Sequence, residues 1–228
     1  MDARKNKNNK QYVADFEKHW LENLQALCDE IMERRYKPRP STCFIVTHPK
    51  QREVFAADFR DRIVHHLLFG YIHKMLERTF IYDSYSCIKQ RGTHFGIRRL
   101  ERHIRSCSQN YSKPCYIMKM DIKGYFMSID RKKLKEITEQ HITKMLSHKA
   151  DDGKRWSEKL DADLVLYLNK EITLLDPSDN CHVDGKRSDW DGLPESKSLF
   201  YSKTGCGLPI GNLTSQLYSN VYLNVFDQ

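Results

Sequence analysis

A short alternating segment that ends in an acid constrains the fold of this 228-residue chain more than any other stretch. From Tyr116, the sequence YIMKM alternates between two faces, and Asp121 follows it directly. Alternation with aromatic and β-branched members predicts a β-strand. A carboxylate at a strand end can hold Mg²⁺ against a phosphate, because this ion takes one or two protein carboxylates and completes its shell with water and substrate oxygens. Capping of the following helix is the alternative role of Asp121.

A second constraint is a loop rich in glycine, GCGLPIGN, which begins at Gly205 and leads into a helical pattern. Gly207 and Gly211 let the backbone approach a ligand closely, and Asn212 is a suitable helix cap. The buried stripe of the helix is predicted from apolar residues that recur every four positions, namely Leu213, Leu217, Val221 and Val225.

Asp121 and this loop, in this order, resemble the palm of a reverse transcriptase. The closest likeness is to the enzymes of diversity-generating retroelements, which are relatives of the group II intron enzymes. Ile210, Gly211, Ser215 and Gln216 match the apolar-Gly-x-x-x-Ser-Gln signature of that group. The resemblance implies an α+β fold with the fingers and partial palm of a right-hand polymerase. It also implies a small antiparallel sheet packed by helices, and no thumb.

The resemblance divides the chain into an N-terminal helical extension (1–40), fingers (41–110) and an incomplete palm (111–228). The implied activity is RNA-templated DNA synthesis, in which two Mg²⁺ ions assist nucleotide transfer from a dNTP to a primer 3′-hydroxyl. Asp121 would be the catalytic metal ligand, together with the backbone carbonyl of Ile122. The remaining carboxylates would come from a Tyr-x-Asp-Asp turn, which this sequence does not reach. We therefore expect the 228 residues alone not to extend a primer.

A predicted hairpin carries the cations expected to hold the triphosphate. Two strand-like runs, 43–46 and 54–57, flank a turn that contains Lys50 and Arg52. Cations near the tip of a hairpin can clamp phosphates, and arginine is suited to bidentate binding. The resemblance assigns the same role to this hairpin, with Arg52 as the best match by position. A merely solvated turn is the alternative.

Four further residues are expected at the nucleotide on the basis of the resemblance. Phe126 would lie against the sugar and select deoxynucleotides, although from sequence alone it could equally be a core residue. Ile210, Gly211 and Gln216 would lie beneath the incoming nucleotide. Most reverse transcriptases have glutamine where this chain has Ile210. In diversity-generating enzymes such a replacement accompanies low fidelity opposite template adenines.

Positive charge indicates a polyanionic partner, since the formal net charge is +8 and the pI about 9.0. A helix predicted over residues 93–106 has an inner stripe of Ile97, Leu100 and Ile104. Six cations on and before this helix could neutralise a template backbone, with a solvated face as the alternative. They are Lys89, Arg91, Arg98, Arg99, Arg102 and Arg105.

Apolar periodicity predicts several packing helices and one long loop. Adjacent His65 and His66 would face different directions on their helix, which favours a structural role over metal binding. Asp130 is expected to cap a helix. A polar loop over residues 176–204 receives no chemistry. The predicted helices cover residues 12–35, 59–78, 132–150 and 160–175.

Other features limit the class of protein. No apolar run reaches eighteen residues, so no membrane span is expected. The basic N-terminus lacks the apolar core of a secretory signal. Seven unpatterned cysteines indicate reduced thiols in the cytoplasm. The expected partners are template RNA, a primer, a dNTP and a small basic accessory protein. The alternatives are a non-catalytic RNA-binding remnant and a group II intron or defence-type reverse transcriptase.

Overall fold

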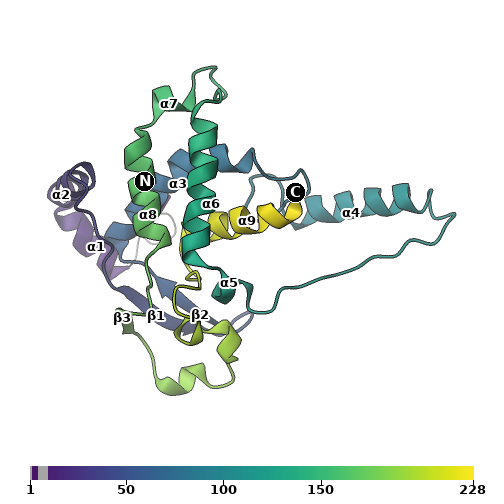
Figure 1. The fold of residues 1–228 in the computed structure, drawn as a ribbon. Coiled ribbons are helices and arrows are strands. Elements are labelled where there is room, and N and C mark those ends of the chain that lie inside the picture. Colours follow the sequence, from purple (N-terminus) through teal and green to yellow (C-terminus); the bar gives the residue numbers. More distant parts are fainter. Residues whose placement is uncertain (1, 5–9) are drawn as a thin grey trace.

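The computed structural model describes residues 2–4 and 10–228 and has an α+β fold (Figure 1). Helices stand over a small sheet, and α4 projects from the body as an arm. The α-helices are α1 (Gln11–Lys18), α2 (Trp20–Met32), α3 (Phe59–Glu77), α4 (Thr93–Cys107), α5 (Tyr125–Ser128), α6 (Arg131–Leu146), α7 (Trp156–Lys159), α8 (Ala162–Thr173) and α9 (Leu213–Asp227). The strands are β1 (Ser41–Val46), β2 (Arg52–Ala56) and β3 (Cys181–Val183).

The main hydrophobic core lies between α3, α6, α8 and α9, where long apolar side chains leave water. Leu27 and Ile31 of α2 belong to the same cluster. Residues of all three predicted segments of the chain therefore share one core. Asp130 caps α6 as expected, because its Oδ1 accepts a hydrogen bond of 3.0 Å from the backbone N–H of Lys133. The fully buried members of the core include Leu68, Ile72, Leu134, Ile142, Leu168 and Val221.

The sheet is mixed, which corrects the prediction of an antiparallel one. β1 and β2 form the predicted hairpin, with Cys43 opposite Phe55 in antiparallel register. β3 pairs with the other edge of β1 in parallel, and Cys181 lies opposite Ser41. This strand comes from the long polar loop, where the sequence shows no strand pattern of useful length. A three-residue strand carries too little periodicity to be predicted.

One face of the sheet has its own small core. Cys43 and Phe55 contact Met127 of α5 and Leu199 of the 3₁₀ turn η4 (Leu199–Tyr201). Two further 3₁₀ turns, η2 (Arg187–Trp190) and η3 (Glu195–Lys197), precede it. This face of the sheet is therefore covered by short turns of the long loop and by the helix α5.

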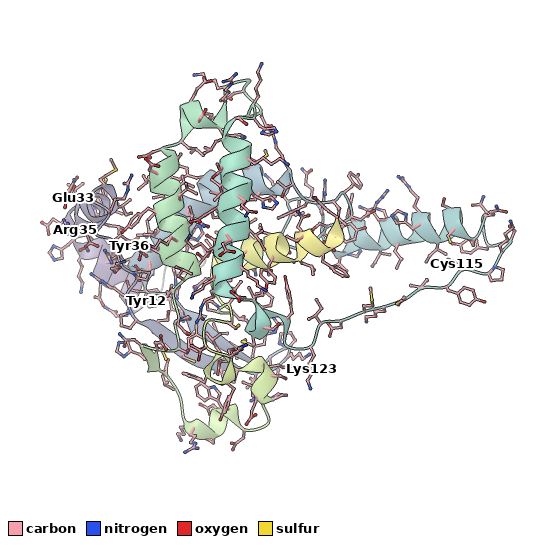
Figure 2. The ribbon with its side chains drawn as sticks, viewed as in Figure 1. Tyr12, Glu33, Arg35, Tyr36, Cys115 and Lys123 are labelled. Carbon is pink, nitrogen blue, oxygen red and sulfur yellow. The ribbon has the colours of Figure 1, made fainter. Side chains whose placement is uncertain are left out.

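The strand predicted at residues 116–120 is absent. After the turn that follows α4, the chain runs back to the body without regular structure, and its Tyr116 side chain is 93% exposed. Figure 2 shows this stretch as an extended segment between Cys115, near the far end of the arm, and Lys123 at the body. A strand needs a neighbour to satisfy its backbone N–H and C=O groups. In the described part of the chain no strand lies beside this segment.

The predicted helix at residues 93–106 is present as α4, but its apolar stripe is not buried. Ile97 and Leu100 are 56% and 49% exposed, and no described residue of α4 is fully buried. Periodicity predicted the helix correctly and its packing incorrectly. Among the helices of the described residues, none has the length and apolar character needed to cross a lipid bilayer.

Candidate nucleotide-binding site

One pocket of about 230 Å³ collects residues from four distant stretches of the sequence. The turn of the β-hairpin forms one wall, and the chain from the arm into α5 forms another. The glycine-rich loop and the η3 turn complete the lining. The predicted site residues that line this pocket are Lys50, Arg52, Asp121, Ile122, Phe126 and Ile210.

The glycine-rich loop lies along the edge of β2, which brings it beside the hairpin. The backbone N–H of Phe55 donates a hydrogen bond of 2.9 Å to the carbonyl oxygen of Ile210. Gly211 has a φ of +126°, and a Cβ there would lie 2.8 Å from Cγ1 of Val54. Only glycine fits this conformation and approach. Gly211 borders a groove on the other side of β2, so it holds Ile210 in place and does not itself line the pocket.

Backbone contacts also join the glycine-rich loop to α5 and α6. The N–H of Gly207 donates to the carbonyl of Ile129, and the N–H of Leu208 donates to that of Phe126, each at 2.8 Å. Phe126 contacts both hydrophobic clusters and lines the pocket. Phe126 is therefore both a core residue and a pocket residue, so the two predicted roles do not exclude each other.

A buried arginine, which sequence reasoning missed, fixes the glycine-rich loop through hydrogen bonds to its backbone carbonyl oxygens. The guanidinium of Arg131 donates to the carbonyl oxygens of Cys206 and Gly207, at 3.0 and 3.3 Å. It also pairs with Asp176. Burial alone would raise the pKa of Asp176, but hydrogen bonds from Ser178 and the charge of Arg131 lower it below its ordinary value. In the sequence Arg131 looks like an ordinary first-turn residue, so no local signal identifies this role.

Asp121 is exposed on the lining of the pocket, and no ion pair between described residues includes it. Of the described residues that line the pocket, Asp121 is the only acidic one. Asp121 and the carbonyl of Ile122 suit the protein share of one Mg²⁺ shell, which phosphate and water oxygens would complete. Among the described residues, no group of three or more His, Cys, Asp or Glu side chains gathers at one point. The carboxylates needed for a second ion are thus not beside Asp121 in this part of the chain.

Gln216 lies away from the pocket. Its Oε1 accepts a hydrogen bond of 3.2 Å from the Cys87 thiol. Both residues line a separate cavity, which Phe69 and Phe80 also border. The first turn of α9 therefore directs Gln216 toward the loop before α4. The structure does not bring this predicted nucleotide contact together with the other residues.

The six predicted template-binding cations divide into two groups. Arg99 forms a bidentate ion pair with Asp83 at 2.6 and 2.8 Å, and the Arg99 guanidinium lies 4.8 Å from the ring centroid of Tyr82. These hydrogen bonds hold the pKa of Asp83 far below its ordinary value. Arg91 lies over the same ring and Arg105 pairs with Glu101. Within the described ranges no ion pair involves the exposed Lys89, Arg98 and Arg102.

His65, the first of the two adjacent histidines, has a structural role. His65 is buried in the body, and its Nδ1 lies 2.7 Å from the hydroxyl oxygen of Thr214 at the start of α9. Burial, with the charges of His66 and Arg62, lowers the pKa of His65 from 6.5 to about 4. A neutral, hydrogen-bonded imidazole of this kind links α3 to the helix that follows the glycine-rich loop.

Comparison with known proteins adds one similarity. No protein-family model matches the sequence. Protein YkfC of Escherichia coli (strain K12) is 24% identical to the chain over 207 residues, which are 90% of this chain and 44% of YkfC. The chain therefore spans less than half the length of this curated relative. An identity of 24% is a similarity only and assigns neither a family nor an activity to this chain.

Proposed function

We propose that this chain binds a deoxynucleoside triphosphate with Mg²⁺ and is the nucleotide-binding part of an RNA-directed DNA polymerase. The observation that carries the proposal is the convergence of Arg52, Asp121, Phe126 and Ile210 on one pocket. These four residues come from distant stretches of the sequence, and the resemblance assigns all of them to the nucleotide. Their meeting in one pocket would rarely arise by coincidence. The signature in the loop favours an enzyme of the diversity-generating type acting in the cytoplasm on template RNA and a primer.

The side chains around the pocket suit the parts of a nucleotide. Lys50 and Arg52 are exposed cations that can donate to phosphate oxygens. Phe126 supplies an apolar wall of the size of a sugar, and Ile210 supplies a second apolar surface. Asp121 would orient a Mg²⁺-bound triphosphate. When bound, the ion would neutralise phosphate charge and stabilise the attacking and leaving oxygens.

Equilibrium binding of a fluorescent dGTP analogue, with and without Mg²⁺, tests this proposal. We expect Mg²⁺-dependent binding, which Arg52→Ala weakens about tenfold through the loss of charge-assisted hydrogen bonds. Asp121→Asn should remove most of the Mg²⁺ dependence. Arg155→Ala, at the α7 end of the molecule away from the sheet (Figure 1), is the matched control. Unchanged affinity in both pocket variants, or no binding by the wild type, would contradict the proposal.

The exposed cations on and before α4 favour a second candidate, a non-catalytic RNA-binding protein. Lys89, Arg98 and Arg102 are available to phosphates whether or not the pocket binds a nucleotide. The same titrations separate the candidates. Salt-sensitive RNA binding without any Mg²⁺-dependent dGTP binding would support this second function. Group II intron and defence-type polymerases would share the nucleotide site and differ in their template RNA.

A further inference from the structure

The long polar loop, to which the sequence assigns no chemistry, lies below the strands in Figure 1 and packs against the hairpin. Its η3 turn contributes Ser196 and Lys197 to the pocket lining. Lys197 is exposed, and no ion pair among the described residues involves it. Among the described residues, the pocket therefore has three lysine or arginine side chains, Lys50, Arg52 and Lys197, and one acid, Asp121. This balance suits a ligand with several negative charges.

A buried carboxylate fastens the loop to β2. Glu53 is 1% exposed and accepts three hydrogen bonds from the loop. Its Oε1 accepts from Nε1 of Trp190 and from the hydroxyl of Ser198, both at 2.8 Å. Its Oε2 accepts from the backbone N–H of Leu199 at 2.6 Å. A buried carboxylate is costly unless its oxygens are satisfied in this way, so the anchor fixes the chain on either side of η3.

A second fastening joins the loop to the turn of the hairpin. The amide Nε2 of Gln51 donates to the carbonyl oxygens of Asp189 and Asp191, at 2.9 and 3.1 Å. Gln51 lies between Lys50 and Arg52 in the sequence. The position of both hairpin cations is therefore coupled to the loop that carries Lys197.

The loop also meets the chain that carries Asp121. Gly124 has a φ of +63°, and a Cβ at Gly124 would lie 2.8 Å from the carbonyl oxygen of Ser196. Only a glycine allows the loop backbone to come so close. Ser196, the residue before Lys197, therefore packs directly against the turn between Asp121 and Phe126.

We propose that Lys197 is a third phosphate-binding cation of the pocket and that Glu53 is the residue that positions it. This inference rests on the proposed nucleotide-binding function. Three cations on two separate segments, the hairpin turn and the long loop, would surround the triphosphate, and the buried Glu53 anchor holds these two segments together. The long loop is therefore a part of the nucleotide site and not a solvent-exposed insertion.

Competition binding tests the role of Lys197. We expect Lys197→Ala to weaken displacement of the fluorescent dGTP analogue by Mg²⁺-tripolyphosphate about tenfold, because a charge-assisted hydrogen bond is lost. Displacement by deoxyguanosine should not change. Lys186→Ala removes a lysine of the same loop that does not line the pocket, and it should leave both affinities unchanged. Equal tripolyphosphate affinity in the wild type and Lys197→Ala would overturn the inference.

Failure of the inference can be told from failure of the proposed function. If Arg52→Ala weakens dGTP binding and Lys197→Ala does not, only the role of Lys197 is wrong. If the wild type does not bind the nucleotide at all, the proposed function fails and the inference with it.

A double-mutant cycle tests whether Glu53 acts through Lys197. Glu53→Gln should weaken triphosphate binding severalfold in the wild type and clearly less in the Lys197→Ala background. Equal losses in the two backgrounds would show a general structural role and contradict positioning. Trp190→Phe, which keeps an aromatic side chain and removes one donor to Glu53, gives the same comparison if Glu53→Gln does not fold.

Discussion

The pocket and the arm show opposite relations between sequence pattern and structure. At the pocket, residues from distant stretches meet because buried polar groups, Arg131 and Glu53, fasten the loops that carry them. On the arm, α4 and the returning segment have equally regular patterns, yet Leu100 and Tyr116 remain exposed. A pattern of apolar residues thus specifies a local shape, whereas its burial depends on a second surface.

The glycine-rich loop should give the largest effect of a single substitution. Gly211→Ala introduces a side chain at a φ of +126°, with Cβ 2.8 Å from Val54 Cγ1 and 3.1 Å from the Phe55 carbonyl. We expect a loss of about 4 kcal/mol in the free energy of unfolding from strain and overlap together, measured by urea denaturation. Gly70→Ala, on an exposed position of α3 with open space around it, should instead stabilise by up to about 1 kcal/mol. Similar changes in unfolding free energy for Gly211→Ala and Gly70→Ala would contradict the special conformational requirement at Gly211.

Paired leucine substitutions compare the body and the arm directly. Leu68→Ala in the core of α3, where the residue is fully buried, should cost about 3 kcal/mol of unfolding free energy through lost burial and a cavity. Leu100→Ala in α4 should cost less than about 0.5 kcal/mol, because its side chain is already half exposed. Thermal or urea unfolding measures both. A large cost for Leu100→Ala would mean that α4 is covered in solution.

The buried imidazole predicts a pH dependence of stability. The folded-state pKa of His65 is about 4 and its ordinary value is 6.5. Below pH 6.5 the unfolded chain therefore binds the proton first, and stability falls as the pH drops toward 4. The expected contribution at pH 5 relative to pH 8 is a loss of about 2 kcal/mol. His65→Gln, which does not titrate, should lose less between these two pH values in urea denaturation. An identical pH dependence in the two proteins would contradict the neutral buried imidazole.

The smallest expected effects concern the arm cations. Arg98→Ala and Arg102→Ala should each lower the salt dependence of single-stranded RNA binding by about 0.7 in log–log slope, with little change in melting temperature. Arg99→Ala should instead lower the melting temperature and leave the salt slope nearly unchanged, because the Arg99 guanidinium is paired with Asp83. Fluorescence anisotropy at several salt concentrations and thermal melting measure the two quantities. Equal salt slopes for Arg98→Ala and the wild type would remove the arm from the RNA interface.

Sequence patterns predicted the secondary elements well where each pattern is local. The hairpin, α4, α6, α8 and α9 lie close to their predicted ranges. The prediction of a strand at residues 116–120 was wrong. An alternating pattern favours an extended conformation but does not supply the neighbouring strand that its hydrogen bonds need. Gln216 stands apart from the other predicted site residues for a related reason. The helix that carries it turns its side chain toward Cys87, and that direction depends on how α9 packs.

The missed residues at the pocket share a physical cause. Glu53, Arg131 and Lys197 act through partners more than forty positions away or through a loop whose path the sequence does not reveal. A charged residue in a strand or a first helical turn usually faces solvent. Their burial or position follows from tertiary packing, and no local periodicity encodes it.

Photochemical labelling with 8-azido-dATP and Mg²⁺ tests the central claim most directly, because it maps where a nucleotide binds. Mass spectrometry of the labelled peptides should place the adducts in the pocket stretches, at residues 50–52, 121–127, 196–197 or 210, and unlabelled dATP should suppress them. Competable labelling confined to α4 or to the groove behind Gly211 would contradict the account, as would the absence of any competable labelling.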